Sequence, residues 1–320
     1  MSTTTGSFRY LDPSTISPSS PPWAKVDVDF SSYSRISRSR SVTNLRDFLG
    51  PGASSQPDGF GTDIDVAGFA VYHAPAQEKA FTDDAAVRGP YYAEVEALLR
   101  AKLEDAARGK RVKKVVIFDH TIRKHDASAA RQPVQQVHVD QTPRAAEARV
   151  RRHVADAAEA EALLRTSRYQ LINVWRPIGH PATDFPLAVV DWRTTDPTDL
   201  VAVNLLYPVR QGDDGDDDDD DRGKEVLPDP ASLQSTEGYE VKGETYGVLP
   251  NDKHKFYYVK DMTPDEAMFI KCFDNWGDGQ PEGKKGVAAL TPHTAFIDPQ
   301  TPPGTKGRES IEVRCLVFYE

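Results

Sequence analysis

The sequence has few cysteines and no long hydrophobic segment. Only Cys272 and Cys315 occur among 320 residues, too few for a disulfide framework or a cysteine-based zinc site. Each lies in an apolar run that predicts a strand, so we expect two buried, inert thiols. No run reaches the roughly 18 apolar residues of a membrane-spanning helix, and the first residues, MSTTTGSFRY, lack a signal-peptide pattern. These absences favour a cytoplasmic protein with no membrane partner.

Positive charge is also in deficit, with 39 Lys and Arg against 49 Asp and Glu, a net charge of −10. Eight of the carboxylates belong to one short run, Asp213, Asp214 and Asp216 to Asp221. This run lies in a Gly- and Asp-rich insertion at about residues 211–239 and lacks the spaced ligands and closing Glu of a calcium loop, which predicts a solvated loop. Without a strongly basic face, the chain is not expected to bind nucleic acid.

The first 65 residues are rich in Ser, Pro, Gly and Asp and show little hydrophobic periodicity. This composition predicts an extended or partly disordered N-terminal arm over residues 1–65. Residues 66–320 are then expected to form a single catalytic domain that carries the Asp-rich insertion.

Strand patterns dominate the second half of the chain. Helical spacing predicts one helix after residue 90, ending near 109, and a second helix over 142–166, on either side of a strand at 112–122. Eight further short strands, separated by Pro, Gly and Asp turns, are expected at 169–178, 186–194, 200–209, 244–250, 255–262, 266–274, 288–297 and 310–320. This pattern predicts a mainly β fold with flanking helices (α+β), in the form of a barrel or two-sheet jelly roll.

A histidine and a carboxylate stand two residues apart in VHVDQT, as His138 and Asp140. Alternate residues of a strand project from the same face, so both side chains point to one place. With the distant His293 they form the facial triad of non-haem Fe(II) oxygenases, which leaves positions open for co-substrate and O₂. A His-x-acid pair alone is common by chance, and the features that follow His293 make the iron site the favoured interpretation.

The last strand opens with Arg308 and Ser310. A guanidinium binds a carboxylate through two hydrogen bonds and a hydroxyl adds another donor, which suits the distal carboxylate of 2-oxoglutarate. Arg314 faces the same way by strand alternation and is the alternative anchor. Arg176 either binds a carboxylate of co-substrate or substrate, or pairs with a core carboxylate such as Asp191.

Three more residues are candidates for the substrate pocket. His120 follows a predicted core strand, and a buried, hydrogen-bonded histidine near the site is favoured over a fourth metal ligand. Tyr257 and Tyr258 point to opposite faces of their strand, so at most one of them lines the pocket.

Eight sequence blocks carry a family resemblance. In chain order they are FDHTIR (118–123), VHVDQT (137–142), INVWRPI (172–178), PLAVVDWR (186–193), KFYYVKDM (255–262), IKCFD (270–274), TPHTAF (291–296) and SIEVR (310–314). Together they resemble the fungal hydroxylase/desaturase family that includes a gibberellin desaturase and is related to a protein of bacterial cephem methoxylation.

That family is similar to Fe(II)/2-oxoglutarate-dependent oxygenases with a double-stranded β-helix core of the jelly-roll, cupin-like type. The resemblance therefore implies Fe(II), 2-oxoglutarate and O₂ as cofactor and co-substrates, with His138, Asp140 and His293 as iron ligands. It further implies hydroxylation or desaturation of a small secondary metabolite.

Two other functions compete with this interpretation. The same fold suits a non-catalytic β-barrel that binds a small molecule or serves a biosynthetic cluster as a partner protein. The cephem relative suggests a role beside a methyltransferase, but no Gly-rich turn that would cradle a nucleotide cofactor is found in the sequence.

Overall fold

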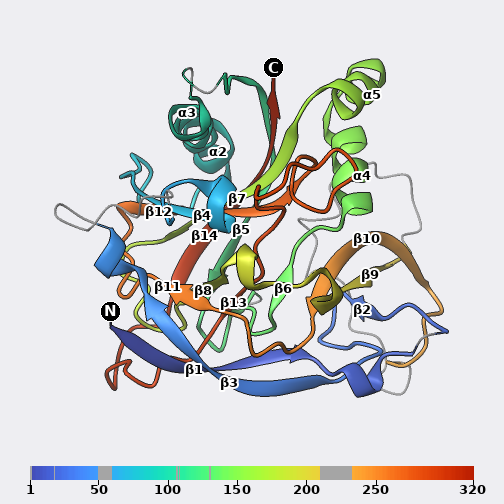
Figure 1. Cartoon of the computed structure of the whole chain (residues 1–320). Helices are drawn as coiled ribbons and strands as arrows, with labels where there is room; N and C mark the ends of the chain where they lie inside the picture. The colour runs from blue at the N-terminus through green and yellow to red at the C-terminus, as the bar shows by residue number, and fades with distance from the viewer. Residues whose placement is uncertain are drawn as a thin grey trace.

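A computed structural model of the chain describes residues 2–17, 19–49, 60–105, 107, 109–129, 131–209 and 233–320. Two β-sheets face each other, and helices cover the outer side of the smaller sheet (Figure 1). The Asp-rich run and the greater part of the predicted insertion at 211–239 lie outside the described residues.

The larger sheet has nine strands in the order β1-β3-β11-β8-β13-β6-β10-β9-β2. All neighbours are antiparallel except β3 with β11 and β9 with β2. In sheet order, its strands are Thr3–Leu11, Arg35–Asn44, Phe256–Tyr258, Leu187–Val190, His293–Ala295, His138–Val139, Tyr239–Val248, Leu200–Pro208 and Trp23–Lys25.

The smaller sheet has five antiparallel strands in the order β4-β12-β7-β14-β5. In that order they are Phe69–His73, Glu266–Asp274, Tyr169–Pro177, Glu309–Tyr319 and Val112–Lys124. Its central strand β7 is buried at every position, because one face looks into the space between the sheets and the other packs under a helix. The apolar run YQLINVW suits a strand covered on both sides.

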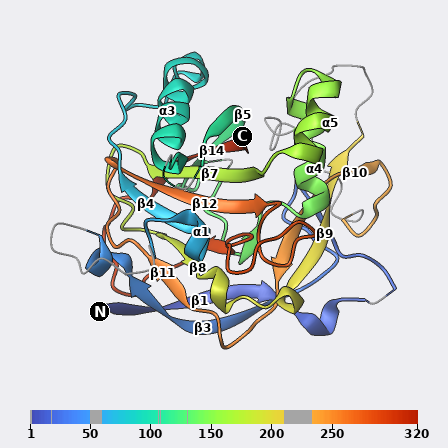
Figure 2. The same ribbon diagram turned by 45° about the horizontal axis from the view of Figure 1, so that its top comes forward.

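Helix α3 (Tyr92–Leu103) covers the outer face of the smaller sheet (Figure 2). Val95, Leu99 and Leu103 recur at intervals of four residues, so they lie on one face and pack against Ile172 and Val313 of the sheet. The remaining helical segments are α1 (Ile64–Ala67), α2 (Asp84–Ala86), α4 (Pro143–His153), α5 (Ala157–Thr166) and short turns at Pro13–Thr15, Leu45–Phe48, Val87–Tyr91, Trp192–Thr194 and Pro197–Asp199.

The single helix predicted over 142–166 is wrong, because the segment forms two helices, α4 and α5. Val154 ends α4 with an extended backbone and is buried. Asp156 then accepts a hydrogen bond from the backbone N–H of Glu159 at 2.8 Å and caps a new helix. High helix propensity on both sides concealed this capping signal.

The N-terminal residues belong to the larger sheet. The sequence placed residues 1–65 in an arm outside the jelly roll, whereas β1, β2 and β3 are strands of that sheet. Burial alternates along β1, and the side chains of Phe8, Tyr10 and Leu11 are fully buried. With few apolar residues in TTTGSFRYL, the period of two that marks a strand is weak in this segment.

The eight strands expected after residue 169 are all present, as β7 to β14, and the mainly β jelly-roll prediction is confirmed. The thiols of Cys272 and Cys315 are free and buried, as expected, and burial raises the pKa of each. Within the described part of the chain, no helix is long and apolar enough to cross a membrane.

Candidate metal centre

His138, Asp140 and His293 meet in the space between the two sheets. His138 in β6 and His293 in β13 are direct partners across neighbouring antiparallel strands, and their ring centroids lie 4.5 Å apart. Asp140 follows β6 and turns its carboxylate toward both rings. One potential ligand atom from each residue lies within 4.8 Å of the other two. The spacing argument from the sequence thus agrees with the geometry.

Backbone carbonyls orient both imidazole rings. Nδ1 of His138 lies 2.7 Å from the carbonyl oxygen of Gln136, and Nδ1 of His293 lies 3.0 Å from that of Thr291. A carbonyl only accepts, so each Nδ1 carries the proton and donates it. In a neutral ring Nε2 is then an acceptor, and the two Nε2 atoms lie 3.3 Å and 4.0 Å from Oδ1 of Asp140.

Three acceptor atoms therefore face one another, an arrangement that a cation stabilises. Two imidazole nitrogens and one carboxylate oxygen form the donor set of a non-haem Fe(II) site. Backbone partners on the far side of each ring are the usual support of metal-bound histidines. The residues present fit an iron ion.

Burial and charge set the pKa values of the three residues. Burial, followed by the charge of His138, lowers the pKa of His293 to about 4, so this ring is neutral at pH 7. Burial alone acts to raise the pKa of Asp140, but the hydrogen bond from His138 and the charges of both histidines hold it well below its usual value. Burial acts to lower the pKa of His138, but the hydrogen bond and the charge of Asp140 have the larger combined effect, so the pKa of His138 is raised.

Asn173 is a site residue that sequence reasoning missed. Its side-chain Nδ2, on the inner face of β7, donates to Oδ2 of Asp140 at 2.6 Å. This bond fixes the carboxylate so that Oδ1 faces the histidines. The segment INVWRPI contains a signal for this role, because Asn173 is a polar side chain within an apolar strand and a buried amide needs a hydrogen-bond partner.

A small cavity of about 40 Å³ joins the three residues to Arg308. Arg308 is 2% exposed, and its guanidinium lies 5.6 Å from the ring centroid of Trp175. Nη1 donates to the carbonyl oxygen of Phe185 at 2.7 Å, while the buried Nε has no hydrogen-bond partner among the described residues.

Burial, with a smaller contribution from Arg123, lowers the pKa of Arg308 to about 9. The guanidinium stays protonated at pH 7, and the charges of Glu312 and Asp184 offset only part of the effect of burial. An incoming carboxylate supplies a partner for Nε and further negative charge, so Arg308 fits a 2-oxoglutarate anchor. Ser310 is buried two residues further along, opposite Pro177 in β7.

The alternative anchors are engaged elsewhere. Arg314 forms a two-pronged ion pair with Asp119 in β5, with Nε 2.6 Å from Oδ1. Arg176 points to the outer face of β7, where Nη1 donates to the carbonyl oxygens of Ala74 and Pro264. The pairing of Arg176 with Asp191 is also wrong, because Asp191 binds Arg193 at 2.9 Å.

The three further pocket candidates lie away from the metal-ligand set. His120 is buried, and its Nδ1 lies 2.9 Å from the hydroxyl of Tyr92 in α3, on the outer side of the smaller sheet. Tyr257 packs against Phe60, and Tyr258 against Phe296. Strand alternation predicts at most one of the two tyrosines in the pocket, and the structure brings neither to the cavities that contain His138.

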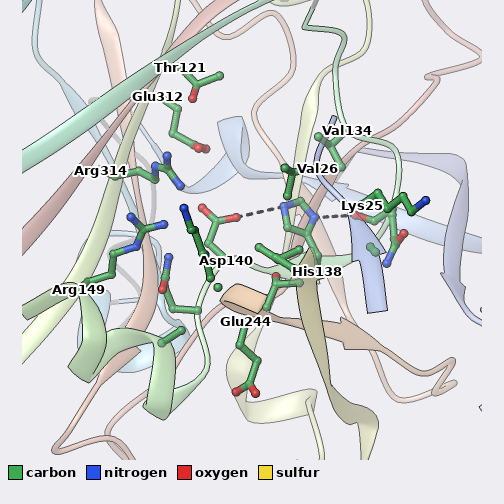
Figure 3. A pocket seen from close by; sticks show the side chains of 18 of the residues that line it. Lys25, Val26, Thr121, Val134, His138, Asp140, Arg149, Glu244, Glu312 and Arg314 are labelled. Atoms are coloured by element: carbon green, nitrogen blue, oxygen red, sulfur yellow. Dashed lines mark hydrogen bonds and ion pairs between the residues drawn. The ribbon is translucent and has the colours of Figure 1, made fainter. Parts of the chain in front are cut away.

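A second, larger cavity of about 260 Å³ shares His138 and Asp140 with the small one (Figure 3). Its wall comes from distant parts of the chain, which are β2 near the N-terminus, β5, helix α4, β10 and the last strand β14. Lys25 and Val26 of the N-terminal segment, Arg149 of α4, and Glu312 and Arg314 of β14 all face it. No motif near position 25 predicts that these residues line the cavity.

The chain is similar to known proteins over most of its length. A family model described as Oxidoreductase/YMDC permease-like domain matches residues 53–218 and 226–318. Hydroxylase/desaturase efuI of Hormonema carpetanum is 30% identical over 276 residues, covering 80% of this chain and 79% of that protein. Hydroxylase/desaturase asaB of Aspergillus flavus is 37% identical over 174 residues, and the match spans 54% of this chain and 65% of that protein.

A solved structure carries the likeness over the whole chain. The iron and alpha-ketoglutarate-dependent endoperoxidase NvfI superposes with a TM-score of 0.70 and 25% identity, covering 99% of this chain and 98% of that one. The resemblance expected from the sequence blocks is confirmed: the chain belongs to the fungal hydroxylase/desaturase family, within the Oxidoreductase/YMDC permease-like domain family.

Proposed function

We propose that this protein is a non-haem Fe(II)/2-oxoglutarate-dependent oxygenase that hydroxylates or desaturates a small-molecule secondary metabolite. The observation that carries the proposal is the convergence of three potential ligand atoms from His138, Asp140 and His293 beside the buried Arg308, whose Nε has no hydrogen-bond partner among the described residues. Relatives named as hydroxylase/desaturase and as Fe(II)/2-oxoglutarate-dependent dioxygenase support it.

In this proposal the protein holds each component in a fixed place. His138, Asp140 and His293 bind iron, and the carbonyls of Gln136 and Thr291 keep both rings oriented. Asn173 keeps the Asp140 carboxylate turned toward the metal position.

Arg308, stacked on Trp175, binds the distal carboxylate of 2-oxoglutarate, and Ser310 adds a neutral donor. Bound Fe(II) and 2-oxoglutarate supply, with O₂, an oxidant able to remove hydrogen from an unactivated C–H bond, with succinate and CO₂ as co-products.

The chain's remaining role is to place the substrate and exclude water. The small cavity is lined by the buried side chains of Trp175, Leu187 and Ala295, while the larger cavity, which also contains His138, offers space for a substrate. We propose that the enzyme works in the cytoplasm, where its two thiols stay reduced.

Anaerobic titration of the metal-free protein with Fe(II) and 2-oxoglutarate tests the proposal. We expect a visible metal-to-ligand charge-transfer band, which arises only when the co-substrate chelates the iron. His138→Ala and Asp140→Ala should each abolish or strongly weaken the band, since each removes one of three protein ligands. His73→Ala is the control, because His73 is exposed at the end of β4.

Absence of the band in the wild-type protein would refute the oxygenase function and favour the non-catalytic binding or partner protein. A band that survives both ligand substitutions would show that iron binds elsewhere. Release of succinate on exposure to air, measured over a panel of fungal metabolites, then identifies substrates.

A further inference from the structure

The larger cavity has an excess of positive charge in its wall. Among the described side chains that line it, seven are basic and three are acidic. This is the reverse of the whole chain, whose net charge is −10. A concave wall of one sign focuses the electrostatic potential into the cavity and favours ligands of the opposite sign.

Some of this charge is already balanced. Carboxylates outside the wall pair with three of the cations, in the pairs Arg35–Asp29, Lys242–Glu240 and Arg314–Asp119. Lys25, Arg123, Arg149 and Arg152 are the other four cations of the wall, and none of these four is without an interaction partner. Of the three wall carboxylates, Asp140 faces the two histidines, Glu244 accepts a hydrogen bond from the hydroxyl of Thr142, and Glu312 interacts electrostatically with Arg123 and Arg314.

Helix α4 presents the basic part of this wall next to the metal centre. Ala145, Ala148, Arg149 and Arg152 recur at intervals of three and four residues, so they share one face of the helix and all line the cavity. The two small alanines leave space in front of the two arginines. Figure 3 shows Arg149 and Arg314 on the same side of the cavity as Asp140.

One aromatic ring orients both guanidinium groups. Cζ of Arg149 lies 5.4 Å and Cζ of Arg314 lies 5.7 Å from the ring centroid of Phe118. Phe118 is buried, and the ring of His153 stacks on it at 4.8 Å. A cation held against a buried ring loses little conformational freedom when it binds a ligand, which favours recognition of an anion.

Building on the proposed oxygenase function, we propose that the substrate carries an anionic oxygen group, such as a carboxylate, which Arg149 binds at the α4 wall of the larger cavity. Arg152 reinforces this subsite from the next turn of the helix. The anionic group then anchors one end of the substrate, and its apolar part lies toward His138 and the metal. This subsite is separate from Arg308, which lines the small cavity and serves the co-substrate.

A matched pair of fluorescent probes tests the proposal without knowledge of the natural substrate. 8-Anilinonaphthalene-1-sulfonate is anionic, and N-phenyl-1-naphthylamine has the same ring system without the charge. We expect the protein loaded anaerobically with Fe(II) and 2-oxoglutarate to bind the anion at least about tenfold more tightly, the value of one charge-assisted hydrogen bond.

Variants locate the subsite. Arg149→Gln should remove most of the preference for the anion, Arg149→Lys should retain part of it, and Arg152→Gln should have a smaller effect. Arg151→Gln is the matched control, because Arg151 lies on the same helix outside the cavity wall and pairs with Glu147 and Glu161. The affinity for 2-oxoglutarate, read from the charge-transfer band, should not change in any of these variants.

Equal binding of the two probes, or a preference that survives the combined Arg149→Gln and Arg152→Gln changes, would overturn the proposal. So would a loss of 2-oxoglutarate affinity in Arg149→Gln, which would assign the arginine to the co-substrate. All of these results would be obtained with a protein that shows the charge-transfer band. If the proposed oxygenase function is wrong, the wild-type protein shows no band, so the two failures can be distinguished.

Discussion

Two clusters of buried charged and polar groups lie in this fold, and they are built in opposite ways. At the metal centre, His138, Asp140 and His293 direct three acceptor atoms at one another. At the second cluster, Asp65 and Asp274 lie among the cations Arg168 and Lys271. We call these four residues, Asp65, Arg168, Lys271 and Asp274, the charge cluster.

Every oxygen of the charge cluster has a donor. Oδ1 of Asp65 accepts from Arg168 at 2.6 Å and from Lys271 at 2.7 Å, and Oδ2 accepts from Lys110 at 2.6 Å. Oδ2 of Asp274 accepts from Arg168, Lys271 and Gln170. Lys271 completes its three bonds with the carbonyl oxygen of Ala288 at 2.8 Å.

The difference distinguishes a structural site from a functional one. In the charge cluster donors and acceptors saturate each other, so it needs no ligand and ties α1 to the smaller sheet. At the metal centre the donors are satisfied on the outside of the rings and the acceptors face inward. Both clusters contain buried ionisable groups, so the orientation of donors and acceptors carries the functional signal.

The largest effect is expected when the charge cluster is broken. Lys271→Met leaves two buried carboxylates with fewer cations and should lower the free energy of unfolding by about 3–5 kcal/mol, measured by urea denaturation. Lys113→Met, at an exposed position of β5, should change it by no more than about 0.5 kcal/mol. Folded Lys271→Met protein should still bind iron, and a loss of iron affinity there would erase the distinction between the clusters.

A smaller effect is expected at the co-substrate anchor. Arg308→Gln removes a charged donor and should weaken 2-oxoglutarate binding by about 10- to 100-fold, the equivalent of 1.5–3 kcal/mol, in titrations of the Fe(II)-loaded protein. Ser310→Ala removes one neutral donor and should cost about 0.5–1.5 kcal/mol. An equal loss in Arg176→Gln would contradict the assignment, since Arg176 lies on the outer face of β7.

Asn173→Ala should weaken iron binding indirectly, because Asn173 contacts the metal ligand Asp140 and not the metal position itself. Loss of the bond to Oδ2 lets the Asp140 carboxylate rotate, and we expect iron affinity to fall by about 10-fold, at the lower end of such changes. Competition with a chelator of known affinity measures it. Asn173→Asp should be worse than Asn173→Ala, because a second carboxylate would face Asp140. If Asn173→Asp binds iron as well as wild type, Asn173 does not position Asp140.

The smallest effect is expected from the acidic run that dominates the chain's net charge. Deletion of Asp213 to Asp221 should leave iron affinity within about twofold of wild type, because the sequence predicts a solvated loop and salt screens the charges of such a loop. The flanking strands β9 and β10 pair directly with each other, so the sheet does not depend on the run. A marked loss of iron affinity in the deletion would assign the run a role at the metal centre.

Much of this molecule could be predicted from its sequence, for physical reasons that also explain the failures. His138 and Asp140 were placed together by the period of two along a strand, and the eight later strands by apolar runs between turns. Strand periodicity does not show which residues of different strands come together in space. The sequence therefore did not predict that Asn173 contacts Asp140 or that Lys25 lines the larger cavity. Arg176 and Arg308 look alike in sequence, and only the face of the strand on which each lies separates them.

The place of β1 and β3 in the larger sheet has a consequence for how the chain folds. Thr4 donates to Asp298, 294 residues away, and β3 pairs with β11. At a synthesis rate of about 5–20 residues per second, the first strands wait tens of seconds for these partners. The sheet closes only when the chain is nearly complete, which predicts slow folding dominated by long-range contacts.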